Sequence, residues 1–342
     1  MPMEDVSRIT TEAAESEIGI EGERRKIQRK GSARKKPGST ATPILHFLST
    51  QTFASPFDVN MAVDAGYKVI IPHTNVRLDH TTGLVQDAIF SRPPHYGCRT
   101  GVFIGGKDAL LALEMLAAAK AALVPPFQLS AFADPGGSFT TAAAMVACIE
   151  EVYRRKTSRS LKGATVAIFG ATGVVGFASA IIAALNGATV KVVSHMGQEA
   201  LKPLVKAGKE RFGVKLIPVL GGRDSDKRKI VAEADIVLCA AAAGIRVLTA
   251  KHLAKSKRTV VVADVNAVPP SGIEDVGLFD FGAPLGQSHI LSVGPLAIGD
   301  IKYKTQAGLF RRMIESEESL MLDFTDAFAI ARKLVRAARG ND

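Results

Sequence analysis

The sequence is poor in cysteine and has no long apolar run. Its three cysteines, Cys98, Cys148 and Cys239, are far apart and show no paired spacing, so neither a disulfide framework nor a zinc knuckle is predicted. No stretch of about 18 uncharged apolar residues could cross a bilayer, and the first 20 residues contain several acids and no apolar core. These absences argue against a secreted or membrane protein, and we expect a cytoplasmic one.

Signatures of metal and nucleic-acid binding are missing as well. Basic residues are scattered over most of the chain without zinc-finger spacing or the aromatic interleaving that reads RNA, so no nucleic-acid partner is predicted. No metal is predicted either, because six histidines show neither an i,i+4 pairing nor a glutamate partner of the zinc type. These are His46, His73, His80, His95, His252 and His289.

The net charge of +10 is concentrated near the N-terminus. Residues 24–36 hold eight basic residues and no acid. They lie in a segment, residues 1–40, that contains Ser, Gly and Pro and lacks apolar periodicity, as is typical of a disordered, solvated tail. A nucleic-acid-binding arm is the alternative. The charge of the remaining chain is compatible with an anionic small-molecule substrate.

The rest of the chain alternates short apolar strands with helices. With 342 residues, of which 47% are hydrophobic, it is long enough for two domains. The first, residues 41–153, has predicted strands at 44–49, 67–72, 100–106 and 127–132, separated by helices at 55–66 and 107–124 and followed by one at 134–156. Such alternation predicts a mainly parallel sheet with helical crossovers.

A polar stretch at 154–162 marks the junction to a second α/β domain, residues 154–300. Its predicted strands, 164–169, 189–193, 214–219, 235–240 and 259–264, alternate with helices in the order of a Rossmann-type doubly wound parallel sheet. The last part, residues 301–342, is expected to be helical. Two amphipathic helices, 295–316 and 322–338, are predicted to pack back on the first domain.

A glycine motif follows the first strand of the second domain. In "VAIFGATGVVGFASAII", Gly170 permits the tight turn, Gly173 lets backbone N–H groups approach a pyrophosphate, and Gly176 permits close helix–strand packing. A structural glycine turn is the alternative. The motif predicts a dinucleotide site that includes Gly170, Ala171, Thr172, Gly173, Val174, Val175 and Gly176.

The next strand lacks the usual selector of the cofactor. Such strands often end in an acid for the ribose or an arginine for a 2′-phosphate, but this one ends in Ser194 and His195. Both side chains can bond a hydroxyl group or a phosphate. We therefore predict use of both NAD and NADP, with a preference below a hundredfold, unless Lys202, Lys206 or another residue decides the choice.

Other strand ends carry further candidate residues. Ala240 and Ala241 are small enough to lie under a nicotinamide ribose, and Asp264, Asn266 and Pro269 follow the next strand. An Asx turn stiffened by proline is the alternative for that loop. Asp134, Ser138, Thr140 and Thr141 lie at a helix start, where Ser138 could simply be the N-cap, and Ser55 and Asp58 fit ordinary capping.

Five motifs together resemble a known family. They are "SPFDVNMAVDAGY", "RTGVFIGGKDA", "VPPFQLSAFADPGGSFTTAAAMV", "DVNAVPPSGI" and "GPLAIGDIKYKTQAGLFRRMIESEESLMLDF". In this order they resemble the bacterial methylene-tetrahydromethanopterin dehydrogenases of one-carbon metabolism and formaldehyde oxidation, nearest to the branch that uses NAD or NADP. The resemblance covers about residues 43–338.

The resemblance implies a pterin-side domain, a cofactor domain and a cleft between them. It implies hydride transfer from 5,10-methylene-tetrahydromethanopterin to the nicotinamide, giving the 5,10-methenyl compound, and it matches Lys302 to an active-site position. Lys304 should face about 200° away from Lys302 on a helix. The residues assigned to the pterin side are Asp58, Asp134, Ser138, Thr140, Thr141, Asn266 and Pro269, and the cofactor side adds Ser194, His195, Ala240, Ala241, Asp264 and Asn266.

The sequence is also compatible with two other functions. The same reaction on methylene-tetrahydrofolate would need similar chemistry, because both carriers present a reduced pterin. A nucleotide-binding redox sensor with a basic tail is the alternative that is not an enzyme. Since oligomers are common among such enzymes, we expect a homo-oligomer, although no interface is evident from the sequence.

Overall fold

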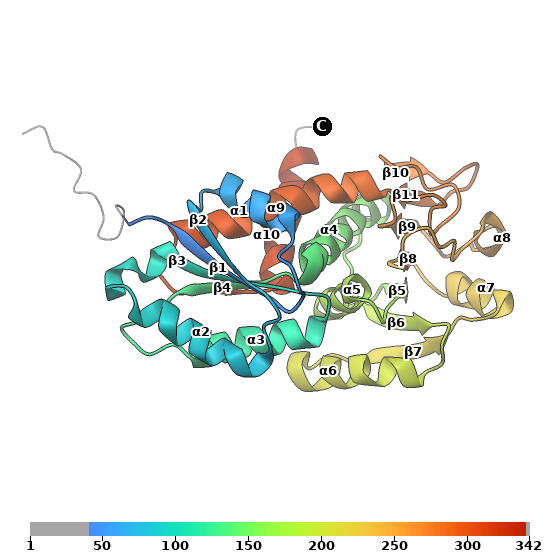
Figure 1. The fold of residues 1–342 in the computed structure, drawn as a ribbon. Helices are drawn as coiled ribbons and strands as arrows, with labels where there is room; N and C mark the ends of the chain where they lie inside the picture. The colour runs from blue at the N-terminus through green and yellow to red at the C-terminus, as the bar shows by residue number, and fades with distance from the viewer. Residues whose placement is uncertain (1–40, 340–342) are drawn as a thin grey trace, which may run out of the picture. The chain divides into compact units, whose positions relative to one another are not determined.

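The computed structural model describes residues 41–339, so the predicted tail at residues 1–40 lies outside the described residues. The described chain contains two β-sheets with helices around each (Figure 1). The predicted fold class, α/β with a Rossmann-type sheet in the second part, is confirmed.

The first sheet has five parallel strands in the order β12-β4-β3-β1-β2. These strands are β1 (Ile44–Ser49), β2 (Val69–His73), β3 (Thr100–Gly105), β4 (Ser130–Ala133) and β12 (Met321–Leu322). Helices α2 (Leu78–Phe90) and α3 (Ala109–Ala121) lie on one side of the sheet, whereas α1 (Pro56–Ala65) and α9 (Pro295–Glu315) lie on the other (Figure 1). β3 is buried along its whole length because both faces of the sheet are covered.

Helix α2 has no counterpart among the predicted elements. Its N-cap residue, Arg77, makes no side-chain cap, and its sequence, LDHTTGLVQDAIF, contains a glycine and two threonines, which are poor helix formers. The helix is held instead by tertiary packing, since Val85, Ala88 and Ile89 are buried. Strand β12 was not predicted from its own sequence either. It has only two residues, and these pair with β4, which is distant in the chain.

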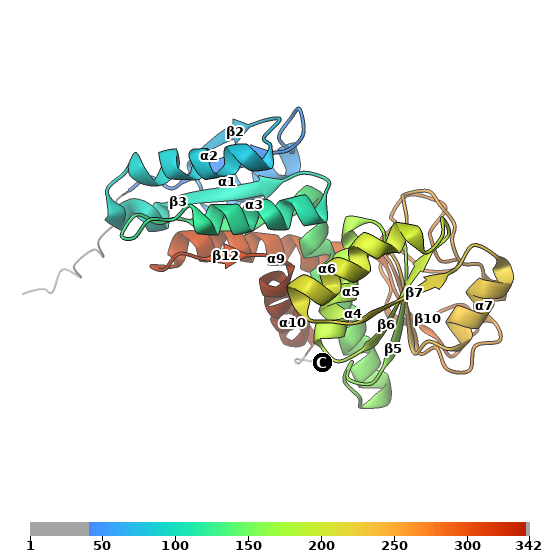
Figure 2. The ribbon, with the colours of Figure 1, turned by 90° about the horizontal axis from the view of Figure 1, so that it is seen from below.

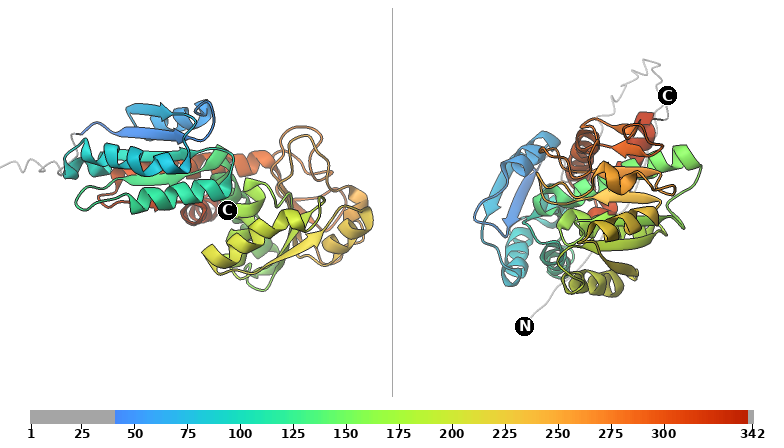
Figure 3. Two further views of the ribbon diagram at one scale, coloured as in Figure 1. Left: turned by 60° about the horizontal axis from the view of Figure 1, so that its bottom comes forward. Right: turned by 90° about the vertical axis from the view of Figure 1, so that its right-hand side faces the viewer.

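The second sheet has seven strands in the order β10-β11-β9-β8-β5-β6-β7. They are β5 (Thr165–Phe169), β6 (Thr189–Ser194), β7 (Leu216–Leu220), β8 (Ile236–Cys239), β9 (Val261–Asp264), β10 (Phe281–Pro284) and β11 (Leu291–Val293). All neighbours are parallel except β10, which pairs antiparallel to β11 and closes one edge. This β10–β11 hairpin was not predicted. Figure 3 shows the sheet from two further directions, coloured from green to orange.

Residues of the second sheet alternate between two apolar clusters. Along β5, Val166 and Ile168 belong to the cluster on one face, and Ala167 and Phe169 to the cluster on the other. This period of two is expected for a strand that is buried on both faces. Around the sheet lie α5 (Val174–Leu185), α6 (Lys202–Phe212) and α7 (Asp224–Ala232) (Figure 2), and α8 (Ala250–Leu253) (Figure 1).

Helix α4 (Ser138–Thr157) joins the two parts of the described chain. It packs against α5, α9 and α10 (Phe324–Arg339), and almost all of its residues up to Tyr153 are buried. Arg332 of α10 donates to both carboxylate oxygens of Glu150 at 2.7 and 2.9 Å and also to Asn186. The C-terminal helices, which were predicted to pack back on the first domain, pack on the rest of the chain, α9 beside α1 and the first sheet and α10 against α4 and α5.

Candidate active site

The glycine turn after β5 has the backbone of an anion cradle. Gly170 has φ of +77°, and a Cβ there would lie 2.4 Å from the Ala240 carbonyl oxygen. A Cβ on Gly176 would lie 2.3 Å from the Gly170 carbonyl oxygen, so neither position tolerates a side chain. Gly173 is the N-cap of α5, and no side chain caps this helix. The first N–H groups of α5 are therefore available to an anion such as a pyrophosphate.

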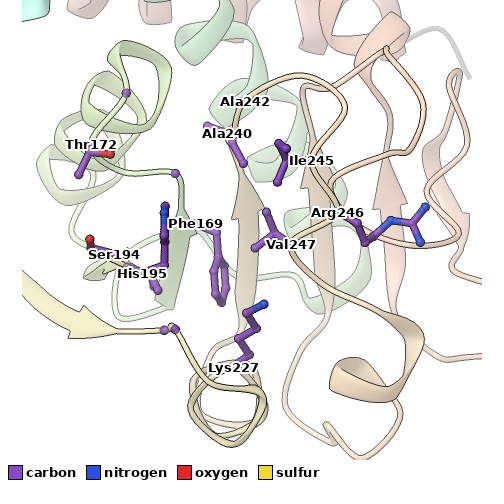
Figure 4. Close-up of a pocket in the computed structure, with 16 residues that line it drawn as sticks. Phe169, Thr172, Ser194, His195, Lys227, Ala240, Ala242, Ile245, Arg246 and Val247 are labelled. Carbon is purple, nitrogen blue, oxygen red and sulfur yellow. The ribbon is translucent and has the colours of Figure 1, made fainter. Parts of the chain in front are cut away.

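A cavity of about 790 Å³ opens beside this turn (Figure 4). This volume is within the range of cofactor sites. The cavity lies at the carboxyl ends of β5, β6, β7 and β8, where doubly wound sheets bind their ligands. It is lined by Phe169, Gly170, Thr172, Gly173, Val193, Ser194, His195, Gly221, Gly222, Lys227, Ala240, Ala241, Ala242, Ile245, Arg246 and Val247.

The structure places the predicted cofactor residues in two groups. Seven of them line the cavity, namely Gly170, Thr172, Gly173, Ser194, His195, Ala240 and Ala241. Six do not: Ala171 is fully buried, Val174, Val175 and Gly176 lie in the first turn of α5, Asp264 is the last residue of β9, and Asn266 lies in the loop that follows.

Sequence reasoning missed several lining residues. The most polar are Lys227 and Arg246, and two glycines, Gly221 and Gly222, are further examples. Gly221 directly follows β7, so the rule that ligands bind at strand ends could have indicated it. Lys227 and Arg246 carry no such signal, because neither directly follows a strand and only the fold brings them to the cavity wall.

Ser194 and His195 stand where β6 ends. The Ser194 side chain is buried, and its Oγ accepts a hydrogen bond from the Met196 N–H at 3.1 Å, which leaves the hydroxyl proton free to donate to a ligand. His195 is exposed. The Gly221 N–H donates to the Ser194 carbonyl at 3.0 Å, so the ends of β6 and β7 are held side by side.

The loop after β9 uses its polar side chains internally. Asp264 accepts hydrogen bonds from the N–H groups of Asn266 and Ile273, each at 3.0 Å. Asn266 accepts from the Val268 N–H at 2.9 Å and donates to the Pro270 carbonyl at 3.0 Å. The peptide bond between Pro269 and Pro270 is cis. The geometry is that of the Asx turn stiffened by proline, and it supplies no observation in favour of a role in binding.

Lys302 belongs to a group of polar residues beside the first sheet. Its ammonium donates to Gln306 Oε1 at 2.7 Å, and Gln306 Nε2 donates to Asp58 Oδ1 at 2.7 Å. The ammonium also lies 3.8 Å from the centroid of the Phe57 ring. Gly137 makes room for it, because a Cβ there would lie 3.0 Å from Lys302 Nζ. The group thus joins α9, α1 and the turn before α4.

Burial and charge act in opposite directions on this lysine. Desolvation lowers the pKa of Lys302, whereas the nearby carboxylates of Asp134 and Asp58 raise it. Desolvation likewise raises the pKa of Asp58 above its ordinary value, and the hydrogen bond from Gln306 opposes this. Gln306 is fully buried and was not identified from the sequence. Its position four residues after Lys302, on the same helix face, was the available signal.

Asp134 caps helix α4 from the preceding strand end. It is fully buried and accepts hydrogen bonds from the Phe139 N–H at 2.8 Å, the Thr140 N–H at 3.2 Å and the Thr140 hydroxyl at 2.6 Å. Burial raises the pKa of Asp134 to about 6. The proposal that Ser138 is the N-cap is wrong, because Gly137 occupies that position and Asp134 satisfies the N–H groups.

The other predicted pterin-side residues differ in their surroundings. The hydroxyl groups of Thr140 and Thr141 both donate to the Gly137 carbonyl, at 3.1 and 2.7 Å. Ser55 is the N-cap of α1 as predicted, since its Oγ accepts from the Asp58 N–H at 3.3 Å. Lys304 is exposed and pairs with Asp300 at 2.6 Å, which confirms that it faces away from Lys302.

Two histidines that the sequence left apart come together across β1 and β2. His46 Nδ1 and His73 Nε2 are 3.2 Å apart.

Within residues 41–339, no group of three or more potential metal ligands is present. In the same part of the chain, no helix is long and apolar enough to span a membrane.

Comparison with known proteins identifies the family. The N-terminal family model of methylene-tetrahydromethanopterin dehydrogenases matches residues 56–136. The NAD(P)-dependent methylenetetrahydromethanopterin dehydrogenase of Methylorubrum extorquens is 46% identical over 291 residues, which cover 85% of this chain and 98% of the relative. The bifunctional protein MdtA of the same organism is 29% identical with the same coverage of both chains.

Among solved structures, the shikimate 5-dehydrogenase of Listeria monocytogenes, in complex with shikimate and NAD, aligns with a TM-score of 0.48 and 13% identity over 86% of this chain and 96% of its own. The high identity to the Methylorubrum enzyme confirms the resemblance inferred from the motifs. The chain therefore belongs to the family of NAD(P)-dependent methylenetetrahydromethanopterin dehydrogenases.

Proposed function

We propose that this protein oxidises 5,10-methylene-tetrahydromethanopterin to the 5,10-methenyl compound, with NAD or NADP as the hydride acceptor. The observation that carries the proposal is the uncapped glycine turn of α5 beside a cavity of about 790 Å³, in a chain that matches its dehydrogenase relative over 98% of that relative's length.

The residues present fit a dinucleotide. The N–H groups at the start of α5 would hold the pyrophosphate, and Gly173 has room for its close approach. Ser194 and His195 would bond the adenosine ribose, and Ala240 and Ala241 would lie under the nicotinamide ribose. When bound, the cofactor accepts a hydride at C4 of its nicotinamide ring.

The reaction needs no catalytic base. A hydride leaves the methylene carbon with both bonding electrons, and the two flanking nitrogens stabilise the cation that remains, so no proton is removed. The protein must therefore bring donor and acceptor carbons within about 3 to 3.5 Å and exclude water. This requirement agrees with the group formed by Lys302, Gln306 and Asp58, whose side chains hold one another in place by hydrogen bonds.

Lys302 would orient the pterin by hydrogen bonding. A full positive charge close to the developing cation would raise the barrier, so the lysine should bond ring acceptors away from the reacting carbon. Gln306 and Asp58 hold its ammonium in place. The residues proposed for the pterin side are Asp58, Asp134, Ser138, Thr140, Thr141, Asn266 and Pro269. Those whose side chains bond only to nearby backbone groups would shape the site without contacting the substrate.

A direct assay tests the proposal. The purified protein is mixed with methylene-tetrahydromethanopterin and with NAD or NADP, and formation of the reduced nicotinamide is followed by its absorbance. Methylene-tetrahydrofolate is run in parallel. Turnover with the methanopterin substrate supports the proposal, whereas turnover with the folate substrate alone, or with neither, contradicts it.

The remaining predictions extend this proposal. We expect a cytoplasmic homo-oligomer that binds no nucleic acid and consists of the domains 41–153 and 154–300, with 301–342 returning to the first. Light scattering coupled to size-exclusion chromatography measures the oligomeric state. A monomer would contradict that part of the proposal.

A further inference from the structure

The cofactor cavity contains two cations, and only one of them is available to a ligand. Arg246 is occupied: its Nε donates to the Ser271 carbonyl at 2.6 Å, and its Nη1 lies 3.4 Å from Glu274 Oε1. Figure 4 shows its guanidinium group pointing away from the other lining residues. Within the described part of the chain, Lys227 Nζ has neither a hydrogen-bond acceptor nor an ion-pair partner, and the same view shows this side chain directed into the cavity.

Lys227 reaches the cavity near the end of β6. The ends of β6 and β7 are joined by the hydrogen bond from Gly221 to Ser194, and a Cβ on Gly222 would lie 3.6 Å from the His195 carbonyl oxygen. Helix α7 starts at Asp224, directly after these glycines, and Lys227 lies in its first turn. Lys227 therefore lines the same cavity as Ser194 and His195 at the end of β6.

The acids near Lys227 have other partners and do not line the cavity. Asp224 is directed to α8, where it lies 3.1 Å from His252 Nε2. Asp226 accepts a hydrogen bond from the Arg223 N–H at 3.3 Å. The hydrogen bond from His252 and, to a lesser degree, the charge of Lys227 lower the pKa of Asp224, but neither carboxylate lines the cavity.

We propose that Lys227 binds the 2′-phosphate of NADP and so supplies the cation that the end of β6 lacks. Ser194 and His195 bond the 2′-position whether it carries a hydroxyl group or a phosphate, and the flexible lysine adds a charge-assisted bond only when the phosphate is present. Because a lysine can swing into solvent, NAD is accepted without a penalty. The inference rests on the proposed use of a nicotinamide dinucleotide.

Binding measurements on the full chain test this assignment without requiring turnover. Isothermal titration calorimetry with NADP and with NAD is performed on the wild-type protein and on the variants Lys227→Met and Lys227→Arg. Lys229→Met is the matched control, because Lys229 is an exposed lysine of the same helix that does not line the cavity. Adenosine 2′,5′-bisphosphate and adenosine 5′-monophosphate serve as fragments that isolate the 2′-phosphate.

Lys227→Met is expected to raise the Kd for NADP by about tenfold to a hundredfold, as for the loss of a bond between two charged groups. The Kd for NAD should change less than about threefold, which also shows that the variant is folded. Lys227→Arg should retain most of the NADP affinity, and Lys229→Met should leave both affinities unchanged.

Three results would overturn the assignment. Equal losses for NADP and NAD would show that Lys227 acts on the shared part of the dinucleotide, and an unchanged NADP affinity would show that it has no role. If the wild-type protein binds neither dinucleotide, the proposed function fails together with this inference, whereas the first two results leave the proposed function intact.

Discussion

Replacement of Asp134 by Asn should make the protein more stable at neutral pH. Asp134 is fully buried, and its carboxylate is held by two N–H groups and one hydroxyl group. An asparagine has the same shape. Its oxygen can accept from the Phe139 and Thr140 N–H groups, and its amide nitrogen can donate to the Thr140 hydroxyl, which already bonds the Gly137 carbonyl.

The magnitude follows from the pKa of the carboxyl group. Burial raises this pKa from 3.8 to about 6 in the folded protein. A raised pKa means that the folded state favours the protonated form, so the stability that Asp134 contributes is fully present below pH 3.8 and is lost as the pH rises through 6. The loss at pH 8 is about 3 kcal/mol, since one pKa unit corresponds to about 1.4 kcal/mol. Asparagine, which stays neutral, avoids this loss.

Urea unfolding followed by circular dichroism measures the effect, and this signal is suitable because the chain contains no tryptophan. The free energy of unfolding of Asp134→Asn should exceed that of the wild type by about 3 kcal/mol at pH 8 and by about 1 kcal/mol at pH 4.5. Asp64→Asn, at an exposed position, should change neither value. A difference that is the same at both pH values, or a less stable variant at pH 8, would refute the reasoning.

Three further predictions concern the two sites. Lys302→Ala should lower turnover by roughly tenfold to a thousandfold with an unchanged Kd for NAD. The control Lys304→Ala should have a turnover close to that of the wild type. Unchanged turnover of Lys302→Ala at saturating substrate would contradict the orienting role. The wild type should prefer one of the two cofactors by less than about 2.8 kcal/mol. His195→Asp should lower kcat/KM for NADP by at least about tenfold and leave kcat/KM for NAD unchanged, because a carboxylate repels the 2′-phosphate. An equal effect on both cofactors would refute this. Gly176→Ala should abolish dinucleotide binding and destabilise the fold by about 1 to 3 kcal/mol, because its Cβ would strike the backbone of the turn at 2.3 Å. The control Gly83→Ala, where no atom lies within 4 Å, should stabilise α2 by about 0.5 to 1 kcal/mol; equal calorimetric and thermal behaviour of the two variants would contradict the steric argument.

Local patterns in the sequence were sufficient for most strands and helices of the two sheets, but not for α2, β10, β11 and β12. Strands such as β5 and β8 are short apolar runs, and the glycine spacing at Gly170, Gly173 and Gly176 follows one of them directly. The seven lining residues found in advance all lie at the carboxyl end of such a strand. The sequence alone also indicated the family, because five separate motifs occur in one order.

The tertiary structure decided everything that depends on residues distant in the chain. Gln306 meets Asp58 across 248 positions, and this contact gives the orientation of Lys302. Helix α2 and strand β12 exist through packing and pairing, although their own sequences predict neither. The sequence determined which residues can bond a ribose or a phosphate, since that is a property of each side chain. Only the fold determined that Lys227 shares a cavity with His195, and that Asp264 and Asn266 form hydrogen bonds near the end of β9. The reason is that the folded chain decides which side chains lie close together and which of their hydrogen-bonding atoms are already used.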